Sequence, residues 1–248
     1  MNIEEYDRLD RIDRDHWFYS GKRAIVRHWI ARHIALRPDD LVIDVGCGTG
    51  AFLLEMVRTC RVLGVDNHDE SLRLAGPRLN AAGGSVLKSG LERIDLPDGC
   101  AAVVTAMDVL EHLDNDTAGM REMVRLARPG GLVVLTVPAL MMLWSDWDEA
   151  LHHRRRYERG QLRRLVDLPD VEPLRCTYYN IAALPLIASV RAWRRIRPVA
   201  PGAERAEDRV PPRWLNRLLY RSLVTPACWE WPGQPIGAAL LAVLRKTR

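Results

Sequence analysis

Short apolar runs alternate with segments of helical periodicity along residues 41–137, and this alternation constrains the fold more than any other feature. The runs 41–45, 62–65 and 132–137 are almost continuously apolar, which is typical of strands that are buried on both faces of a sheet. Shorter strands are expected at 85–87 and 101–106, with helices between successive strands. This alternation implies right-handed crossovers and a parallel sheet that is covered by helices on both faces.

The flanking segments are expected to complete one α/β domain. Before the first strand, residues 3–17 suit a short helix or an ordered arm, and residues 23–36 have helical periodicity. After Pro138 the pattern loosens, and the elements expected there are helices at 158–166, 181–195 and 214–223, strands at 171–179 and 237–244, and a proline-rich loop or lid at 197–212. We therefore divide the single domain, 1–248, into a helical cap (1–37), an α/β core (38–137), a lid or insertion (138–234) and a final strand (235–248).

The composition excludes several classes of protein. Five cysteines are scattered without a Cys-x-x-Cys pair, which argues against a disulfide framework and against a zinc knuckle. The net charge is +4, but no basic face with base-reading aromatic residues can be identified, so we expect no nucleic-acid partner. The acidic N-terminus has no apolar leader and no run reaches about 18 apolar residues, so we expect a cytoplasmic protein.

A glycine-rich loop, GCGTG at residues 46–50, directly follows the first strand. Glycines permit a sharp turn and let backbone N–H groups approach a ligand closely, and ligands of open parallel sheets bind beyond the carboxyl ends of the strands. Asp44 lies just before the loop, where a carboxylate would repel a pyrophosphate and suits an ammonium group or hydroxyls. Asp66 ends the second strand and can accept hydrogen bonds from both ribose hydroxyls. Asp44 therefore disfavours a dinucleotide and an NAD-type oxidoreductase.

Further motifs follow the loop in a fixed order. They are VIDVGCGTG (42–50), LGVD (63–66), LPDG (96–99), DVLEH (108–112) and LARPGG (126–131). Together they resemble the class I S-adenosylmethionine-dependent methyltransferases, and in particular a bacterial small-molecule subgroup. The resemblance implies a Rossmann-like, seven-stranded and mostly parallel sheet with helices on both faces, an antiparallel last strand and a lid. It also implies S-adenosylmethionine as cofactor and S-adenosylhomocysteine as product.

The resemblance assigns roles to individual cofactor-binding positions. Asp44 and Gly46 flank the methionine part, Asp66 holds the ribose, and Leu91 lies where a backbone amide usually meets adenine. Gly90 stands where family members often carry an acid for the adenine amino group, so the adenine contact departs from the family pattern. The expected cofactor-binding residues are Asp44, Gly46, Cys47, Gly48, Gly50, Asp66, Asn67, Gly90, Leu91 and Met107.

His153 and His112 are the candidate catalytic residues. His153 lies in a block that resembles the bacterial subgroup, running from Val137 to Tyr157, and a neutral imidazole there can act as a base near pH 7. The alternative is a structural histidine that fixes the loop, with Arg155 or Arg156 paired to Asp146, Asp148 or Glu149.

A divalent metal is a second alternative for the same histidines. Asp108, Glu111, His112 and His153 offer carboxylates and imidazoles of the kind that hold such an ion beside a substrate hydroxyl. A small-RNA 2′-O-methyltransferase family has a similar cluster, but many metal-free relatives also carry Glu-His at this position. We therefore expect no metal.

The segment after Pro138 is expected to select the acceptor, because residues 138–234 hold six of the eight tryptophans. Aromatic walls favour an apolar or aromatic acceptor, whereas the alternative is that these rings only pack an accessory layer. The expected substrate-binding residues are His16, Trp17, Trp144, Tyr157, Tyr179 and Asn180.

These observations predict methyl transfer to an oxygen or nitrogen of a small molecule, in natural-product or sugar metabolism, by a monomer or homodimer. A protein that binds S-adenosylmethionine without methylating, such as a cyclase or a regulatory binder, is the alternative. The helix 181–195 carries arginines at its end, so contact with an anionic membrane surface is a further, less favoured possibility. These arginines are Arg191, Arg194, Arg195 and Arg197.

Overall fold

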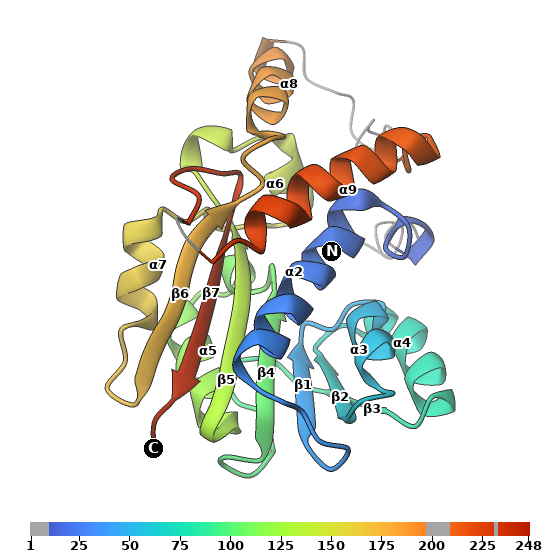
Figure 1. Ribbon diagram of the computed structural model, residues 1–248, viewed down its shortest axis with the longest axis vertical. Coiled ribbons are helices and arrows are strands. Elements are labelled where there is room, and N and C mark those ends of the chain that lie inside the picture. Colours follow the sequence, from blue (N-terminus) through green and yellow to red (C-terminus); the bar gives the residue numbers. More distant parts are fainter. Residues whose placement is uncertain (1–9, 197–208, 231–232) are drawn as a thin grey trace.

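The computed structural model describes residues 10–196, 209–230 and 233–248, which build one seven-stranded sheet with helices on both faces (Figure 1). The strand order is β3-β2-β1-β4-β5-β7-β6. The strands are β1 (Leu41–Val45), β2 (Arg61–Asp66), β3 (Ser85–Lys88), β4 (Ala101–Met107), β5 (Ala127–Pro138), β6 (Val171–Tyr179) and β7 (Ala239–Lys246). Only β7 runs against its neighbours, β5 and β6. The expected Rossmann-like sheet, mostly parallel with an antiparallel last strand, is confirmed.

Two hydrophobic clusters cover the two faces of the sheet. Strand side chains alternate between them: Ile43 and Val45 of β1 pack into one cluster, and Val42 packs into the other. The first cluster is closed by α5 (Asp116–Leu126) and α7 (Arg159–Val166). The second is closed by α2 (Trp17–His33), α3 (Ala51–Met56), α4 (Asp69–Ala81) and α9 (Arg213–Ala227). This packing explains why the strands read as nearly continuous apolar runs.

The segment after β5 adds elements above the carboxyl ends of the strands. These are η2 (Met141–Leu143), α6 (Asp146–Ala150) and α8 (Leu184–Ile196), while η1 (Leu110–His112) follows β4. In Figure 1, α8 and α9 lie at the end of the molecule toward which β1, β4 and β5 run. The segment 138–234, which was expected to form a lid, also supplies β6 to the edge of the sheet.

Two boundaries differ from those expected from sequence because of contacts with distant residues. The helix expected at 23–36 begins at Trp17, where the backbone N–H of Trp17 donates to Asn216 of α9. The strand expected at 132–137 begins earlier, at Ala127, because this residue pairs with Ala101 ahead of a bulge in the β4–β5 register. Both boundaries are set by partners that are distant in sequence.

Some expected elements fall outside the described residues. These are residues 3–9 of the arm expected at 3–17 and residues 197–208 of the loop expected at 197–212. Among the helices of the described ranges, none combines the length and the apolar content that crossing a membrane requires.

Candidate active site

The carboxyl ends of four neighbouring strands open into a cavity of about 600 Å³. The residues at these strand ends line its floor: Val45 of β1, Asp66 of β2, Met107 of β4 and Pro138 of β5. The cavity therefore lies at the place where open parallel sheets bind ligands.

The glycine loop forms one wall of the cavity, and two of its glycines are required by the local geometry. Gly46 has a φ of +67°, and a Cβ there would lie 2.5 Å from the Val109 side chain. Gly48 has a φ of +54°, and a Cβ there would meet nothing within 4 Å. Because Gly48 lines the cavity, its missing side chain leaves space for a ligand to approach the backbone.

Asp66 is fixed at the end of β2 by hydrogen bonds from its surroundings. Its Oδ2 accepts from the backbone N–H of Gly48 at 3.1 Å and from the Ser71 hydroxyl at 2.8 Å. Its Oδ1 accepts from the N–H of His68 at 3.0 Å. The carboxylate lines the cavity in one orientation, which suits recognition of a pair of hydroxyl groups.

Asp44 lies behind this wall rather than in it. Its side chain is only 2% exposed, and the Thr105 hydroxyl donates to its Oδ1 at 2.6 Å. Burial raises the pKa of Asp44 to about 7, and the nearby Asp66 adds to this effect while the Thr105 hydrogen bond opposes it. A cationic group beside such a buried carboxyl would lower its pKa, because a positive charge favours the ionised form.

The structure brings six of the ten expected cofactor-binding residues to the cavity wall, namely Gly46, Gly48, Asp66, Asn67, Leu91 and Met107. The other four lie outside the wall. Cys47 is buried, a Cβ at Gly50 would lie 3.1 Å from Ala75, and Asp44 and Gly90 are not lining residues. The roles assigned to individual contacts remain predictions.

His153 meets a buried carboxylate at the opposite side of the cavity. Its Nδ1 lies 2.9 Å from Oδ1 of Asp148, and both side chains are nearly inaccessible. Burial opposes ionisation of Asp148, yet His153, Arg156 and Arg191 together lower the pKa of this carboxyl to about 2. Because Asp148 is an anion, Nδ1 of His153 carries the proton and Nε2 is free of one in the neutral ring.

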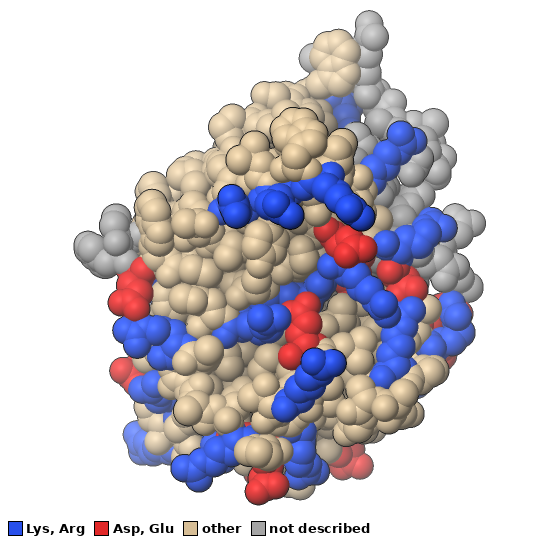
Figure 2. Space-filling view, turned by 45° about the vertical axis from the view of Figure 1, so that its right-hand side comes forward, with Lys and Arg blue, Asp and Glu red and all other residues tan. Residues whose placement is uncertain are grey.

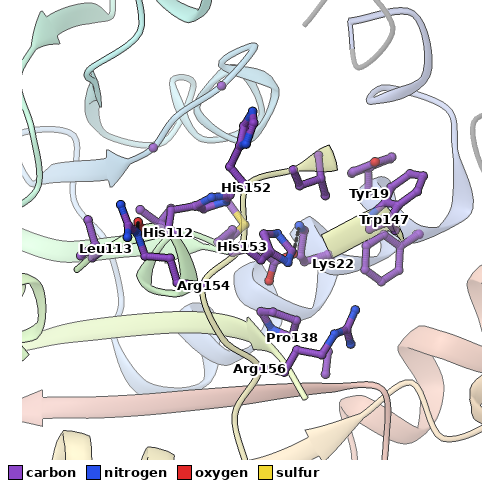
Figure 3. Close-up of a pocket in the computed structure, with 18 of the residues that line it drawn as sticks. Tyr19, Lys22, His112, Leu113, Pro138, Trp147, His152, His153, Arg154 and Arg156 are labelled. Carbon is purple, nitrogen blue, oxygen red and sulfur yellow. Dashed lines mark hydrogen bonds and ion pairs between the residues drawn. The ribbon is translucent and has the colours of Figure 1, made fainter. Parts of the chain in front are cut away.

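Glu111 and His112 lie next to this pair, and Figure 3 shows His112 beside His153. The rings of His112 and His153 meet edge to face with centroids 4.8 Å apart, and Oε1 of Glu111 lies 3.9 Å from Nε2 of His153. Burial raises the pKa of Glu111 well above its usual range and lowers the pKa of His112 to about 4. Burial therefore favours the uncharged form of both side chains. Glu111, His112 and His153 also offer potential metal-ligand atoms that lie within 4.8 Å of one another.

Lys22 and Asp108 form an ion pair at the centre of the cavity wall. Nζ of Lys22 lies 2.6 Å from Oδ2 of Asp108, and the Thr136 hydroxyl donates to Oδ1 at 2.9 Å. Asp108 has a φ of +59°, which is uncommon for a residue other than glycine. Burial alone would raise the pKa of Asp108, but Lys22 keeps it below its usual value.

Three of the six expected substrate-binding residues line the cavity: His16, Trp17 and Asn180. Trp144 and Tyr179 are not among the lining residues, and Tyr179 is fully buried. Tyr157 lines a second, smaller cavity, where its hydroxyl donates to Asp116 at 2.9 Å. The expected Arg156–Asp148 pair forms, whereas Arg155 pairs with Asp116 instead.

Several lining residues were not identified from sequence. They are Tyr19, Lys22, His152, Arg154 and Arg191, among others. Lys22 stood just outside the expected helix, and nothing near it in sequence points to its partner 86 residues away. The sequence features that could have indicated this part of the cavity wall are the adjacent histidines at 152–153 and the aromatic residues at 17–19.

Comparison with known proteins finds a family for the central part of the chain. Residues 43–135 match the family model described as a methyltransferase domain. This segment therefore carries a methyltransferase domain, and solved structures with the same fold include class I S-adenosylmethionine-dependent methyltransferases. The matched segment runs from β1 into β5 and contains the glycine loop, Asp66 and the His112 turn, so it covers the cofactor half of the cavity. S-adenosylmethionine is the cofactor of this methyltransferase domain.

Two curated relatives and one solved structure illustrate the similarity. A sterol 24-C-methyltransferase of Eremothecium gossypii is 27% identical over 56% of this chain and 39% of its own length. A ubiquinone biosynthesis O-methyltransferase of Nitrosospira multiformis is 36% identical over 42% of this chain and 45% of its own length. The methyltransferase of Haloferax volcanii in complex with the activator Trm112 has the same fold, with a TM-score of 0.63, 17% identity and coverage of 97% and 92% of the two chains. The chain spans less than half the length of the two curated relatives.

Proposed function

We propose that this methyltransferase transfers a methyl group to an oxygen or nitrogen of a small apolar molecule, and that a hydroxyl is the acceptor that suits the site best. The observation that carries the proposal is the Asp148–His153 pair in the cavity wall, with 2.9 Å between the carboxylate oxygen and Nδ1. A base is needed only when the acceptor loses a proton, as a hydroxyl does.

In this reaction the residues of the chain would have the following roles. When bound, S-adenosylmethionine supplies a methyl group on a sulfonium, which makes the transfer downhill. Asp148 holds Nδ1–H of His153, so that Nε2 accepts the hydroxyl proton. His153 would then keep the proton that the acceptor hydroxyl gives up when it takes the methyl group. His112 stays uncharged beside His153 because burial lowers its pKa to about 4.

The rest of the cavity supports an apolar acceptor. Trp17, Phe18, Trp147, Leu151 and Ile187 also line the cavity. Walls of this kind bind apolar groups and keep water away from the reacting atoms. The names of the two curated relatives refer to a sterol and to ubiquinone, which are both lipids. A role in natural-product or sugar metabolism remains an expectation from the sequence.

The deciding experiment offers the purified protein methyl-labelled S-adenosylmethionine and fractionated metabolite and lipid extracts. A labelled product that wild-type protein forms and an Asp66→Ala variant does not form supports methyl transfer. Calorimetric binding of S-adenosylhomocysteine without any labelled product in any fraction would instead favour a protein that binds the cofactor without methylating.

The same assay tests our proposal that the reaction needs no metal. Burial favours the protonated form of Glu111, so a metal ion at Glu111, His112 and His153 would compete with a proton and its binding would depend on pH. We expect the same rate with a chelator and with added magnesium, manganese or zinc. Loss of activity with the chelator and its recovery with one of these ions would assign the cluster to a metal.

A further inference from the structure

Exposed large hydrophobic side chains are confined to one part of the described chain. All of them lie between residues 141 and 236, and the cofactor-binding core at 38–137 has none. They are Met141, Met142, Leu186, Trp193, Val210, Trp214, Leu218, Trp229 and Ile236. Isolated exposed apolar residues are ordinary, but a concentration on one segment marks an interaction surface.

Helix α9 presents apolar and basic residues on the same exposed face. Trp214 is 71% exposed and Leu218 is 57% exposed, and Arg213, Arg217 and Arg221 are exposed beside them. At about 100° per residue these five positions fall within an arc of roughly 140°. The opposite face packs on α2, where Leu223 is buried and Asn216 binds the start of α2. The outward arc therefore remains available to a partner.

Helix α8 has a similar outward face and an inward face that belongs to the site. Leu186 and Trp193, seven residues apart, are both exposed, whereas Ile187 and Arg191 line the cavity. Arg191 and Arg194 fold back onto Asp148 and Asp146. These two arginines were among those expected from sequence to make α8 basic. Because both pair with aspartates near the cavity, the positive charge of the outward face comes from α9.

We propose that the α8–α9 face docks on an anionic membrane surface, from which the active site takes its acceptor. This face is defined by Met141, Met142, Leu186, Trp193, Arg213, Trp214, Arg217, Leu218 and Arg221. Figure 2 shows a row of basic side chains across the molecule at the height of α9, with largely uncharged surface above it and acidic side chains only below it. Exposed Trp and Leu interleaved with Arg are the features of helices that lie in a lipid headgroup layer.

Charge favours a membrane over a second copy of this chain as the occupant. Neither α8 nor α9 contains an Asp or a Glu, and none of Arg213, Arg217 and Arg221 has an ion-pair partner among the described residues. A two-fold interface through this face would bring arginines of both copies together. Anionic headgroups would neutralise them, and the apolar side chains would enter the acyl boundary.

The position of α8 connects this face to the cavity. Leu186 points outward and its neighbour Ile187 lines the pocket, so a lipid leaving the membrane would reach the cavity after passing one helix. The acceptor would then be an amphipathic lipid with a hydroxyl group near its head. This statement about the acceptor rests on the proposed function, whereas docking of the protein does not.

Sedimentation with lipid vesicles tests membrane docking and does not require methyl transfer. A negative result would therefore contradict the docking proposal and leave the proposed methyltransferase activity untouched. The full chain is mixed at low salt with vesicles of phosphatidylcholine alone or with added phosphatidylglycerol. We expect binding to the anionic vesicles that weakens as salt is raised. The double variant Trp214→Ser with Leu218→Ser should lower the vesicle-bound fraction roughly tenfold, and Arg213, Arg217 and Arg221→Gln together should lower it on anionic vesicles.

Trp229→Ser is the matched control, because Trp229 is also 58% exposed but follows the opposite end of α9. It should bind vesicles as wild type does. All variants should bind S-adenosylhomocysteine with unchanged affinity, and this result would show that they are folded. Absence of vesicle binding at low salt would overturn the proposal. A dimer in sedimentation velocity that Trp214→Ser with Leu218→Ser dissociates, with no vesicle binding, would assign the face to self-association instead.

Discussion

At the scale of single residues, the Asp148–His153 pair is the feature with the clearest chemical consequence. His153→Ala removes the proposed base but leaves the glycine loop and Asp66 untouched. We expect kcat to fall by about 10²–10⁴-fold, with S-adenosylhomocysteine affinity within a factor of about two. Asp148→Asn should also lower kcat, because the ring loses the carboxylate that fixes its tautomer. His28→Ala, in α2 and outside the cavity, is the control, and unchanged turnover of His153→Ala would exclude the base.

Asp44 leads to a second prediction, in which stability and binding change in opposite directions. Its pKa is raised from 3.8 to about 7 in the folded protein. Protonated Asp44 therefore contributes favourably to the free energy of unfolding. This contribution is complete below about pH 4 and is lost as the pH rises through 7. Asp44→Asn should leave the stability of the cofactor-free protein nearly unchanged at pH 4 and raise it at pH 8, by at most about 4 kcal/mol.

Cofactor binding by the same variant should weaken, because the resemblance places the methionine part of the cofactor beside Asp44. In the wild type, affinity for S-adenosylhomocysteine should rise roughly tenfold between pH 6 and pH 8 as the carboxyl ionises. In Asp44→Asn it should be low and nearly independent of pH. Calorimetry at both pH values and thermal melts of the cofactor-free proteins check both parts. Equal pH dependence in the two proteins would show that Asp44 does not respond to the ligand.

The sequence predicted some of these residues because their role is local. Gly46, Gly48 and Asp66 belong to a strand–loop–helix unit whose chemistry can be recognised from adjacent positions. The Lys22–Asp108 pair could not be predicted, because its members are 86 residues apart and meet only after the sheet has formed. Asp148 was named from sequence only as one possible partner of an arginine, and the structure gives it His153 as well.

At the scale of elements, strands were predicted well and boundaries that depend on distant contacts were not. The range expected for β6, 171–179, is the observed one, because β-branched and aromatic residues that follow a Pro-Asp turn are a local signal of a strand. The start of α2 depends instead on α9. The N–H of Trp17 donates to Asn216 at 2.8 Å, and the amide of Asn216 donates to the carbonyl of Asp15 at 2.7 Å.

This contact across almost 200 residues provides an element-scale prediction. Asn216→Ala should lower the free energy of unfolding by about 1–2 kcal/mol, because an otherwise unpaired N–H at the start of α2 loses its acceptor. Thermal melting should show a decrease of roughly 2–8 °C for a chain of this size. Asn80→Ala, at an exposed position in α4, is the control and should change stability by less than about 0.5 kcal/mol. Equal melting temperatures of the two variants would contradict the linkage of α9 to α2.

At the scale of the whole molecule, the cavity joins segments from almost the entire described chain. His16 to Lys22, the strand ends of the sheet, the 147–156 segment and Ile187 of α8 all contribute to its wall. The sheet and its cofactor half could be predicted from sequence because they follow one repeated unit of strand, loop and helix. The acceptor half could not, because it is assembled from irregular segments whose relative placement depends on tertiary packing.

A ligand that binds such a composite site only in the folded protein must stabilise the molecule as a whole. At a concentration of 100 times its Kd, S-adenosylhomocysteine should add about 2.7 kcal/mol to the free energy of unfolding. This corresponds to a rise in melting temperature of about 5–10 °C for a domain of this length. NAD at the same concentration should cause no rise, because the buried Asp44 disfavours a pyrophosphate, and Asp66→Ala should abolish the response to S-adenosylhomocysteine. A rise with NAD as large as with S-adenosylhomocysteine would mean that the cavity selects for a nucleoside alone and not for the methionine part.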